Sequence, residues 1–117
     1  MDINLSNRSL SHLSYTDLMA SVKHLDLSRN QITEIDSVFR KLKRLERLDL
    51  SDNQIGFLSS ELKCLRFLKT VIIKKNRIKS VAIDFGASQS IEKLNLAGTC
   101  TFNTLNTQLA NLNNNFF

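Results

Sequence analysis

Several residue types are scarce in this chain. It contains no proline, three glycines and two cysteines among 117 residues. The lack of proline and the scarcity of glycine fit strands and tight coils whose turns are made by other residues, asparagine among them. The two cysteines, Cys64 and Cys100, lie far apart and form no cluster. This argues against a disulfide framework and favours a reducing, intracellular setting.

Long apolar runs and catalytic groups are also missing. No apolar run approaches the ~18 residues of a membrane span. The N-terminus lacks a secretory signal pattern, because polar residues interrupt Ile3 and Leu5. There are only two histidines and one tyrosine, and no Ser/His/Asp group, glycine-rich phosphate loop, paired carboxylates or metal-ligand spacing is visible. We therefore expect no enzymatic activity, no cofactor, no metal site and a cytoplasmic location, with the nucleus as the alternative.

A motif of the form L-x-x-L-x-L-x-x-N-x-L recurs every 23 residues. Its fourth and sixth positions alternate with polar residues, which predicts a short strand with its apolar side chains on one face. The asparagine at position nine then turns the chain, and its side chain can hydrogen-bond backbone groups of neighbouring coils. This spacing is typical of leucine-rich repeats, in which each copy buries its apolar face by stacking on the next. The four copies begin at Val22, Leu45, Leu68 and Ile91.

Less regular copies flank these four. A degenerate first copy keeps the apolar spacing but has Arg8 in the asparagine position. The last copy loses the asparagine turn after Leu96, and Leu105, Leu109 and Leu112 predict a short capping helix. We expect one domain over residues 1–117, with repeats near 1–21, 22–44, 45–67, 68–90 and 91–117. No polar cap precedes Ile3, which favours a fragment of a larger protein over a free edge that dimerises.

The predicted fold class is α/β. We expect a right-handed leucine-rich repeat solenoid of about five repeats, each of 22 or 23 residues. A parallel sheet lines its concave side, and short helices or 3-10 turns lie on the convex side. Segments such as residues 59–65, with Leu62 and Leu65 in apolar columns, are expected to form the latter.

Positive charge gathers in the middle of the chain. Residues 40–79 hold twelve lysines and arginines against four acidic residues, whereas the net charge of the whole chain is +5. This basic belt can attract acidic proteins, anionic membranes or nucleic acid, or it can be an ordinary solvated face. Only 7% of the residues are aromatic, so nothing suggests a stacking platform for single-stranded nucleic acid.

The concave face is the default binding surface of such an array. The commonest sequence of such repeats on this face, Leu-Asp-Leu-Ser, carries little information about a partner. The residues that depart from it are therefore the candidates for binding a partner. Arg47 can pair with a partner carboxylate, or with Asp26 or Asp49 across the strands. The candidate partner-binding residues are His24, Arg47, Ile72, Lys74 and Lys93.

Within the superfamily, the chain most resembles the leucine-rich repeat domain of the Rab geranylgeranyltransferase alpha subunit. The resemblance is carried by the short first repeat, by the strand V-x-H-L-D-L-S-x-N that begins at Val22, and by L-N-L-x-G from Leu94. The sequence departs from that family at Thr99 and Cys100, where the family-like ending has asparagine and proline. The resemblance implies an accessory module of a prenylating enzyme, with catalysis in parts of that enzyme that this chain lacks.

The sequence therefore favours a non-enzymatic protein-interaction module whose protein partner is unidentified. One alternative is a substrate-targeting or regulatory subunit of another enzyme, such as a phosphatase or a ubiquitin ligase. The other is binding of nucleic acid or anionic lipid through the basic belt. A small-molecule substrate is not expected.

Overall fold

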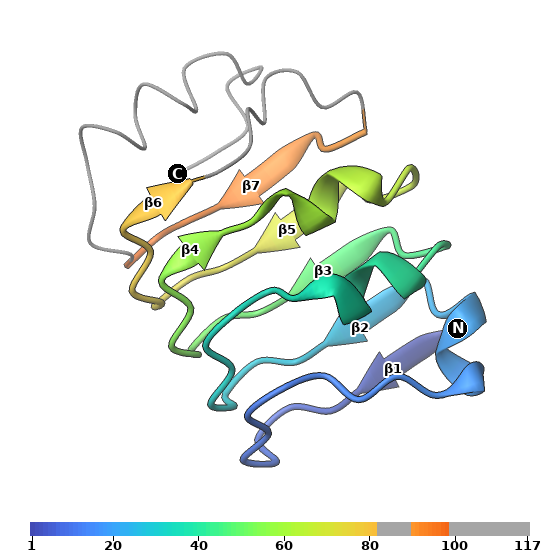
Figure 1. Cartoon of the computed structure of the whole chain (residues 1–117), viewed down its shortest axis with the longest axis horizontal. Helices are drawn as coiled ribbons and strands as arrows, with labels where there is room; N and C mark the ends of the chain where they lie inside the picture. The colour runs from blue at the N-terminus through green and yellow to red at the C-terminus, as the bar shows by residue number, and fades with distance from the viewer. Residues whose placement is uncertain (82–89, 99–117) are drawn as a thin grey trace.

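Five short parallel strands form the main sheet of this protein. The structure is a computed structural model, and it describes residues 1–81 and 90–98. Neighbouring strands pair at offsets of 22 residues for the first pair and 23 for the others. The sheet therefore stacks equivalent residues of successive coils (Figure 1). In order, its strands are β1 (Asp2–Asn4), β2 (His24–Asp26), β3 (Arg47–Asp49), β5 (Thr70–Ile72) and β7 (Lys93–Asn95).

The core is built from the apolar positions of the repeat. The central residue of β2, β3, β5 and β7 is buried, and its two neighbours are half-buried or exposed. This alternation is what a strand requires when one of its faces covers a core. The apolar residues that follow each strand continue the core, so the expected columns are confirmed as far as the structure describes them. One coil, for example, buries Leu45, Leu48, Leu50, Ile55, Leu58, Leu62 and Leu65 completely.

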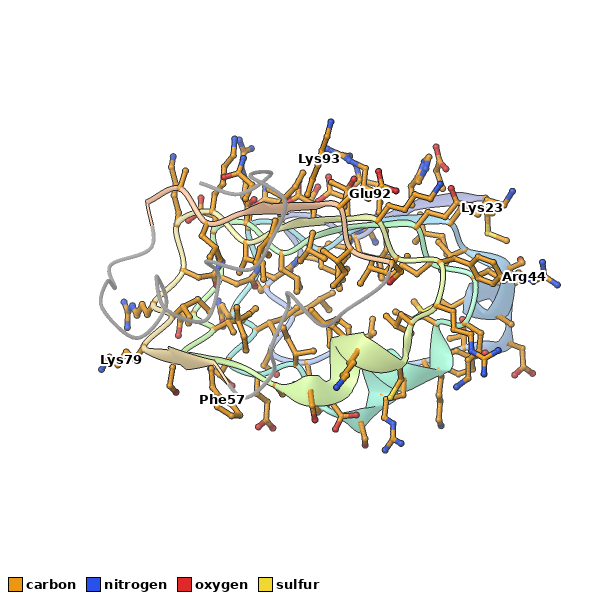
Figure 2. The ribbon with its side chains drawn as sticks, turned by 90° about the horizontal axis from the view of Figure 1, so that it is seen from above. Lys23, Arg44, Phe57, Lys79, Glu92 and Lys93 are labelled. Carbon is orange, nitrogen blue, oxygen red and sulfur yellow. The ribbon has the colours of Figure 1, made fainter. Side chains whose placement is uncertain are left out.

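In the described residues, a small sheet and two of the three 3-10 helices lie opposite the main sheet, and the first 3-10 helix lies at an edge of the molecule, beside Arg44 (Figure 2). In Figure 2 the main sheet runs along the top, with Lys93 labelled on it, and β4 lies along the bottom, with Phe57 labelled. The two-stranded sheet was not expected from the sequence, since its strands have only two residues each and no alternation of their own. The elements are η1 (Asp17–Ser21), η2 (Ser37–Lys41), η3 (Ser60–Cys64), β4 (Phe57–Leu58) and β6 (Ser80–Val81).

Asparagine side chains join successive coils, as the sequence predicted. Asn53 is 5% exposed. Its amide nitrogen donates to the carbonyls of Leu27 (3.0 Å) and Leu50 (3.1 Å), and its Oδ1 accepts from the backbone N–H of Ile32 at 2.9 Å. Asn30 and Asn76 make equivalent bonds. Each asparagine thus satisfies buried backbone groups of its own coil and of the preceding one.

Some predicted features lie outside the described residues. These are the capping helix around Leu105, Leu109 and Leu112 and the end of the last motif at Thr99 and Thr101. Within residues 1–81 and 90–98, no helix is long and apolar enough to cross a membrane.

Candidate partner-binding surface

The outward side chains of the main sheet form one face, which we call the sheet face. The strand register places His24, Arg47, Thr70 and Lys93 side by side in successive coils. His24, Arg47 and Lys93 are exposed, while Thr70 is half-buried. Neighbouring strands lie about 4.8 Å apart, so this row of side chains can be contacted together by one partner.

Two acidic residues of the sheet face, Asp26 and Asp49, are bonded to backbone groups of their own coil. Asp26 Oδ1 accepts from the backbone N–H of Ser28 at 2.9 Å and from its hydroxyl at 2.6 Å. Asp49 Oδ1 accepts from the backbone N–H of Ser51 at 2.9 Å. Both aspartates are half-buried. They therefore stabilise the turn at the end of each strand, a structural role that explains why aspartate recurs at this position.

Arg47 is exposed on β3, two residues before Asp49 and opposite His24 of β2. In the described part of the chain the ion pairs are His24 with Asp2 and Arg40 with Glu61, so Arg47 pairs with neither Asp26 nor Asp49. Of the two alternatives that the sequence left open for Arg47, pairing across the strands is therefore not what the structure has. Its guanidinium is available to a carboxylate from outside.

His24 differs from Arg47 in having an internal partner. Its Nδ1 lies 3.0 Å from Asp2 Oδ1, and both side chains are at least half exposed. Such an exposed pair contributes little to stability. The contact joins β1 to β2 on the sheet face, beside a shallow hollow of about 210 Å³ lined by Asp2, Ile3, Asn4, His24, Leu25, Asp26 and Arg47.

Ile72 and Lys74 interrupt the pattern of the other strands. Asn4, Asp26, Asp49 and Asn95 all accept a hydrogen bond from the backbone N–H two residues later. Ile72 occupies the same position and has no side-chain acceptor. It is half-buried, and Lys74 beyond it is exposed. The strand β5 thus gives the sheet face an apolar residue that pairs with Asp49 on one side and Asn95 on the other, two positions beyond the row in which Thr70 lies between Arg47 and Lys93.

A left-handed backbone position at the end of each strand was not recognised in the sequence. The residue before the asparagine position has φ between 54° and 77° in all five coils. Asparagine, aspartate and glycine adopt this conformation readily, but arginine and lysine do so at a cost. Three of the five coils therefore have a residue that favours this conformation, whereas the arginine and the lysine of the other two gave no such signal. The five residues are Asn7, Arg29, Asp52, Lys75 and Gly98.

The basic belt of residues 40–79 does not lie on one face. Arg47 and Lys74 belong to the sheet face, whereas Arg40, Lys41 and Lys63 are in the 3-10 helices. The remaining cations divide between the two edges of the stack. Lys43, Arg44, Arg66 and Lys69 precede strands, and Lys75, Arg77 and Lys79 follow one.

Comparisons with known proteins agree with this geometry. Residues 20–64 match the family model for leucine-rich repeats, two copies. A solved leucine-rich repeat protein of Leptospira interrogans superposes with a TM-score of 0.69 at 22% sequence identity, over 82% of this chain and 25% of its own. This chain thus spans about a quarter of the length of that protein. A search of curated protein sequences found no match. Residues 20–64 accordingly carry leucine-rich repeats, and the chain has the leucine-rich repeat fold.

Proposed function

We propose that this chain is a non-enzymatic protein-interaction module that binds an acidic or mixed protein surface with its sheet face. Leucine-rich repeat domains generally mediate protein–protein interaction, because stacked coils offer an extended surface. The residues that we assign to the contact are His24, Arg47, Ile72, Lys74 and Lys93.

This proposal is supported by a difference between the cationic and the acidic side chains of the sheet face. Arg47 and Lys93 are exposed and have no ion pair within residues 1–81 and 90–98. The carboxylates of Asp26 and Asp49 are instead half-buried and bonded to backbone N–H groups. A partner therefore meets available cations around the apolar Ile72, which favours an acidic surface with an apolar centre.

We further propose that residues 1–117 form one right-handed solenoid of about five repeats in a cytoplasmic protein. The support is the unbroken parallel register from β1 to β7. Parallel strands joined through the opposite layer are right-handed in nearly all proteins.

The double variant Arg47→Glu/Lys93→Glu tests the sheet face. The intact chain and the variant are each immobilised, and proteins captured from cell lysate are quantified. We expect a specifically captured partner to lose at least about tenfold in recovery, since reversing two contacting charges removes attraction and adds repulsion. The affinity for that partner, once purified, is then measured directly.

A matched control is Arg77→Glu/Lys79→Glu. It makes the same change in net charge at two exposed residues outside the main sheet. This variant is expected to keep the partner. Equal recovery by the intact chain and the Arg47→Glu/Lys93→Glu variant would rule out the sheet face as the binding surface.

The identity of the captured protein separates the narrower proposals. The resemblance to the Rab geranylgeranyltransferase alpha subunit leads us to propose a Rab protein or another component of Rab prenylation. A phosphatase or a ubiquitin-ligase component could instead be captured by the intact chain and lost with the Arg47→Glu/Lys93→Glu variant. The sheet face would then remain the proposed binding surface, and the proposed function would become that of a targeting subunit of that enzyme.

A further inference from the structure

Two turns of adjacent coils project side by side at the edge where the strands begin. One turn contains Lys43 and Arg44, and the next contains Arg66 and Phe67. Equivalent residues are 23 positions apart, as in the strand register that follows. The backbone N–H of Lys69 donates to the Glu46 carbonyl at 2.8 Å, which holds the two coils together just beyond the turns. The two turns therefore stand about one strand spacing, ~4.8 Å, apart.

This edge also exposes large apolar side chains. Phe67 is 56% exposed at the tip of its turn, and Leu18, in η1, is 73% exposed. Figure 2 shows η1 beside the labelled Arg44, at the same edge of the molecule. We call the set Leu18, Lys43, Arg44, Arg66 and Phe67 the strand-start edge. A single exposed apolar residue is ordinary, but two of them with cations between form an amphipathic surface.

Positive charge predominates at the strand-start edge, where the exposed Asp17, next to Leu18 in η1, is the one acidic neighbour within the same elements as these five residues. Just behind the turns, Lys23, Glu46, Lys69 and Glu92 alternate in sign from coil to coil, so this row is neutral. The two turns themselves contain three cations and no acidic residue. Within the described ranges, none of the three forms an ion pair.

We propose that the strand-start edge is a second binding surface, which adsorbs the chain onto an anionic lipid bilayer. Phe67 and Leu18 enter the interfacial layer, and Lys43, Arg44 and Arg66 contact lipid phosphates and carboxylates. A bilayer accommodates apolar contacts on separate coils together with the cations between them. A nucleic acid would gain nothing from Leu18, and a protein partner would need two separate pockets.

The expected strength of adsorption to the bilayer follows from the number of cationic and apolar side chains at the strand-start edge. Each cation near an anionic bilayer strengthens adsorption by roughly fivefold, and the apolar contacts add to it. Three cations without a lipid chain give reversible adsorption that weakens as salt is raised, because exposed charges are screened. The proposal therefore concerns peripheral contact, independent of the sheet face.

Vesicle co-sedimentation of the full chain tests the proposal. Vesicles of phosphatidylcholine alone are compared with vesicles that also contain phosphatidylserine. We expect binding to the second kind only, decreasing with salt. The variant Lys43→Glu/Arg66→Glu should bind at least about 25-fold more weakly, which is two losses of roughly fivefold. Phe67→Ser should weaken binding while leaving its salt dependence nearly unchanged.

The same control, Arg77→Glu/Lys79→Glu, has an equal change in net charge at the opposite edge of the stack. It is expected to bind vesicles within about twofold of the intact chain once the long-range charge effect is screened. An equal loss in both double variants would show attraction by net charge alone and would overturn the proposal. Absence of binding to the anionic vesicles would overturn it as well. Circular dichroism of each variant distinguishes lost binding from lost folding.

Discussion

At the scale of single residues, buried asparagines fix how successive coils stack on one another. Asn53 accepts from the buried N–H of Ile32, and it donates to the carbonyls of Leu27 and Leu50, each of which also accepts from a second asparagine. The net contribution of such a bond is about 1 kcal/mol, but leaving its partner unsatisfied costs about 1–3 kcal/mol. The asparagine column is therefore set by the backbone of two coils at once, which explains why it recurs in the sequence at a fixed spacing.

We predict that Asn53→Ala lowers the free energy of unfolding by about 2–3 kcal/mol, because the Ile32 N–H is left unsatisfied and the carbonyls of Leu27 and Leu50 each lose one of two donors. Urea denaturation followed by circular dichroism measures this. Gln54→Ala is the control, since Gln54 is adjacent and exposed. Similar midpoints for the two variants would contradict the role given to Asn53.

The left-handed position before each asparagine yields a second prediction. Arg29 has φ 56°, and its N–H donates to Ser51 at 2.9 Å. Arg29→Gly should leave the urea midpoint unchanged or raise it, because relief of the backbone cost offsets the greater freedom of the unfolded chain. Arg29→Val should lower stability by about 1–2 kcal/mol, since a β-branched residue is strained there. A loss of stability in both variants would contradict this account.

At the scale of elements, contacts between coils and not intrinsic preferences hold the strands and 3-10 helices in place. The strands have two or three residues and the helices five, too few to be stable alone. Side chains connect η2 to its neighbours: Arg40 Nε lies 3.3 Å from Glu61 Oε2 of η3, and Lys41 Nζ lies 5.4 Å from the centre of the Tyr15 ring. Ser59, the N-cap residue of η3, donates to the Ile35 carbonyl at 2.6 Å.

We predict that Leu48→Asp unfolds the chain. Leu48 is the buried centre of β3, the middle strand of the main sheet. A buried, unpaired carboxylate costs several kcal/mol, comparable with the whole stability of a small domain. Circular dichroism and proteolysis measure the loss. Arg47→Asp should keep the fold, because the adjacent residue points outward. A folded Leu48→Asp protein would refute the assignment of β3.

At the scale of the whole molecule, the stack separates its charges by side. The sheet face has available cations around an apolar residue, and the strand-start edge combines cations with exposed Phe67 and Leu18. Between the two surfaces lies a row without net charge, because the signs of its residues alternate from coil to coil: Lys23, Glu46, Lys69 and Glu92. Because the two surfaces lie on different sides of the coils, the variants that test one of them leave the other intact.

The sequence by itself determined the leucine-rich repeat fold, the strand positions of the main sheet, the core columns and the bonding role of the asparagines. It could do so because the repeat requires the same residue type at the same distance from the strand in each coil, as Leu25, Leu48 and Val71 show. The five candidate residues of the sheet face were also chosen from the sequence, because they depart from the common Leu-Asp-Leu-Ser pattern of the repeat.

Only the tertiary structure decided which of these groups are available. Arg47 and Asp49 are close in sequence, yet Arg47 is exposed and forms no ion pair within residues 1–81 and 90–98, while Asp49 bonds to its own turn. The exposure of Phe67 beside the turn of the preceding coil and the pairing of β4 with β6 arise between residues about 23 positions apart. Such relations depend on the register and geometry of stacked coils, which no single segment of the sequence contains.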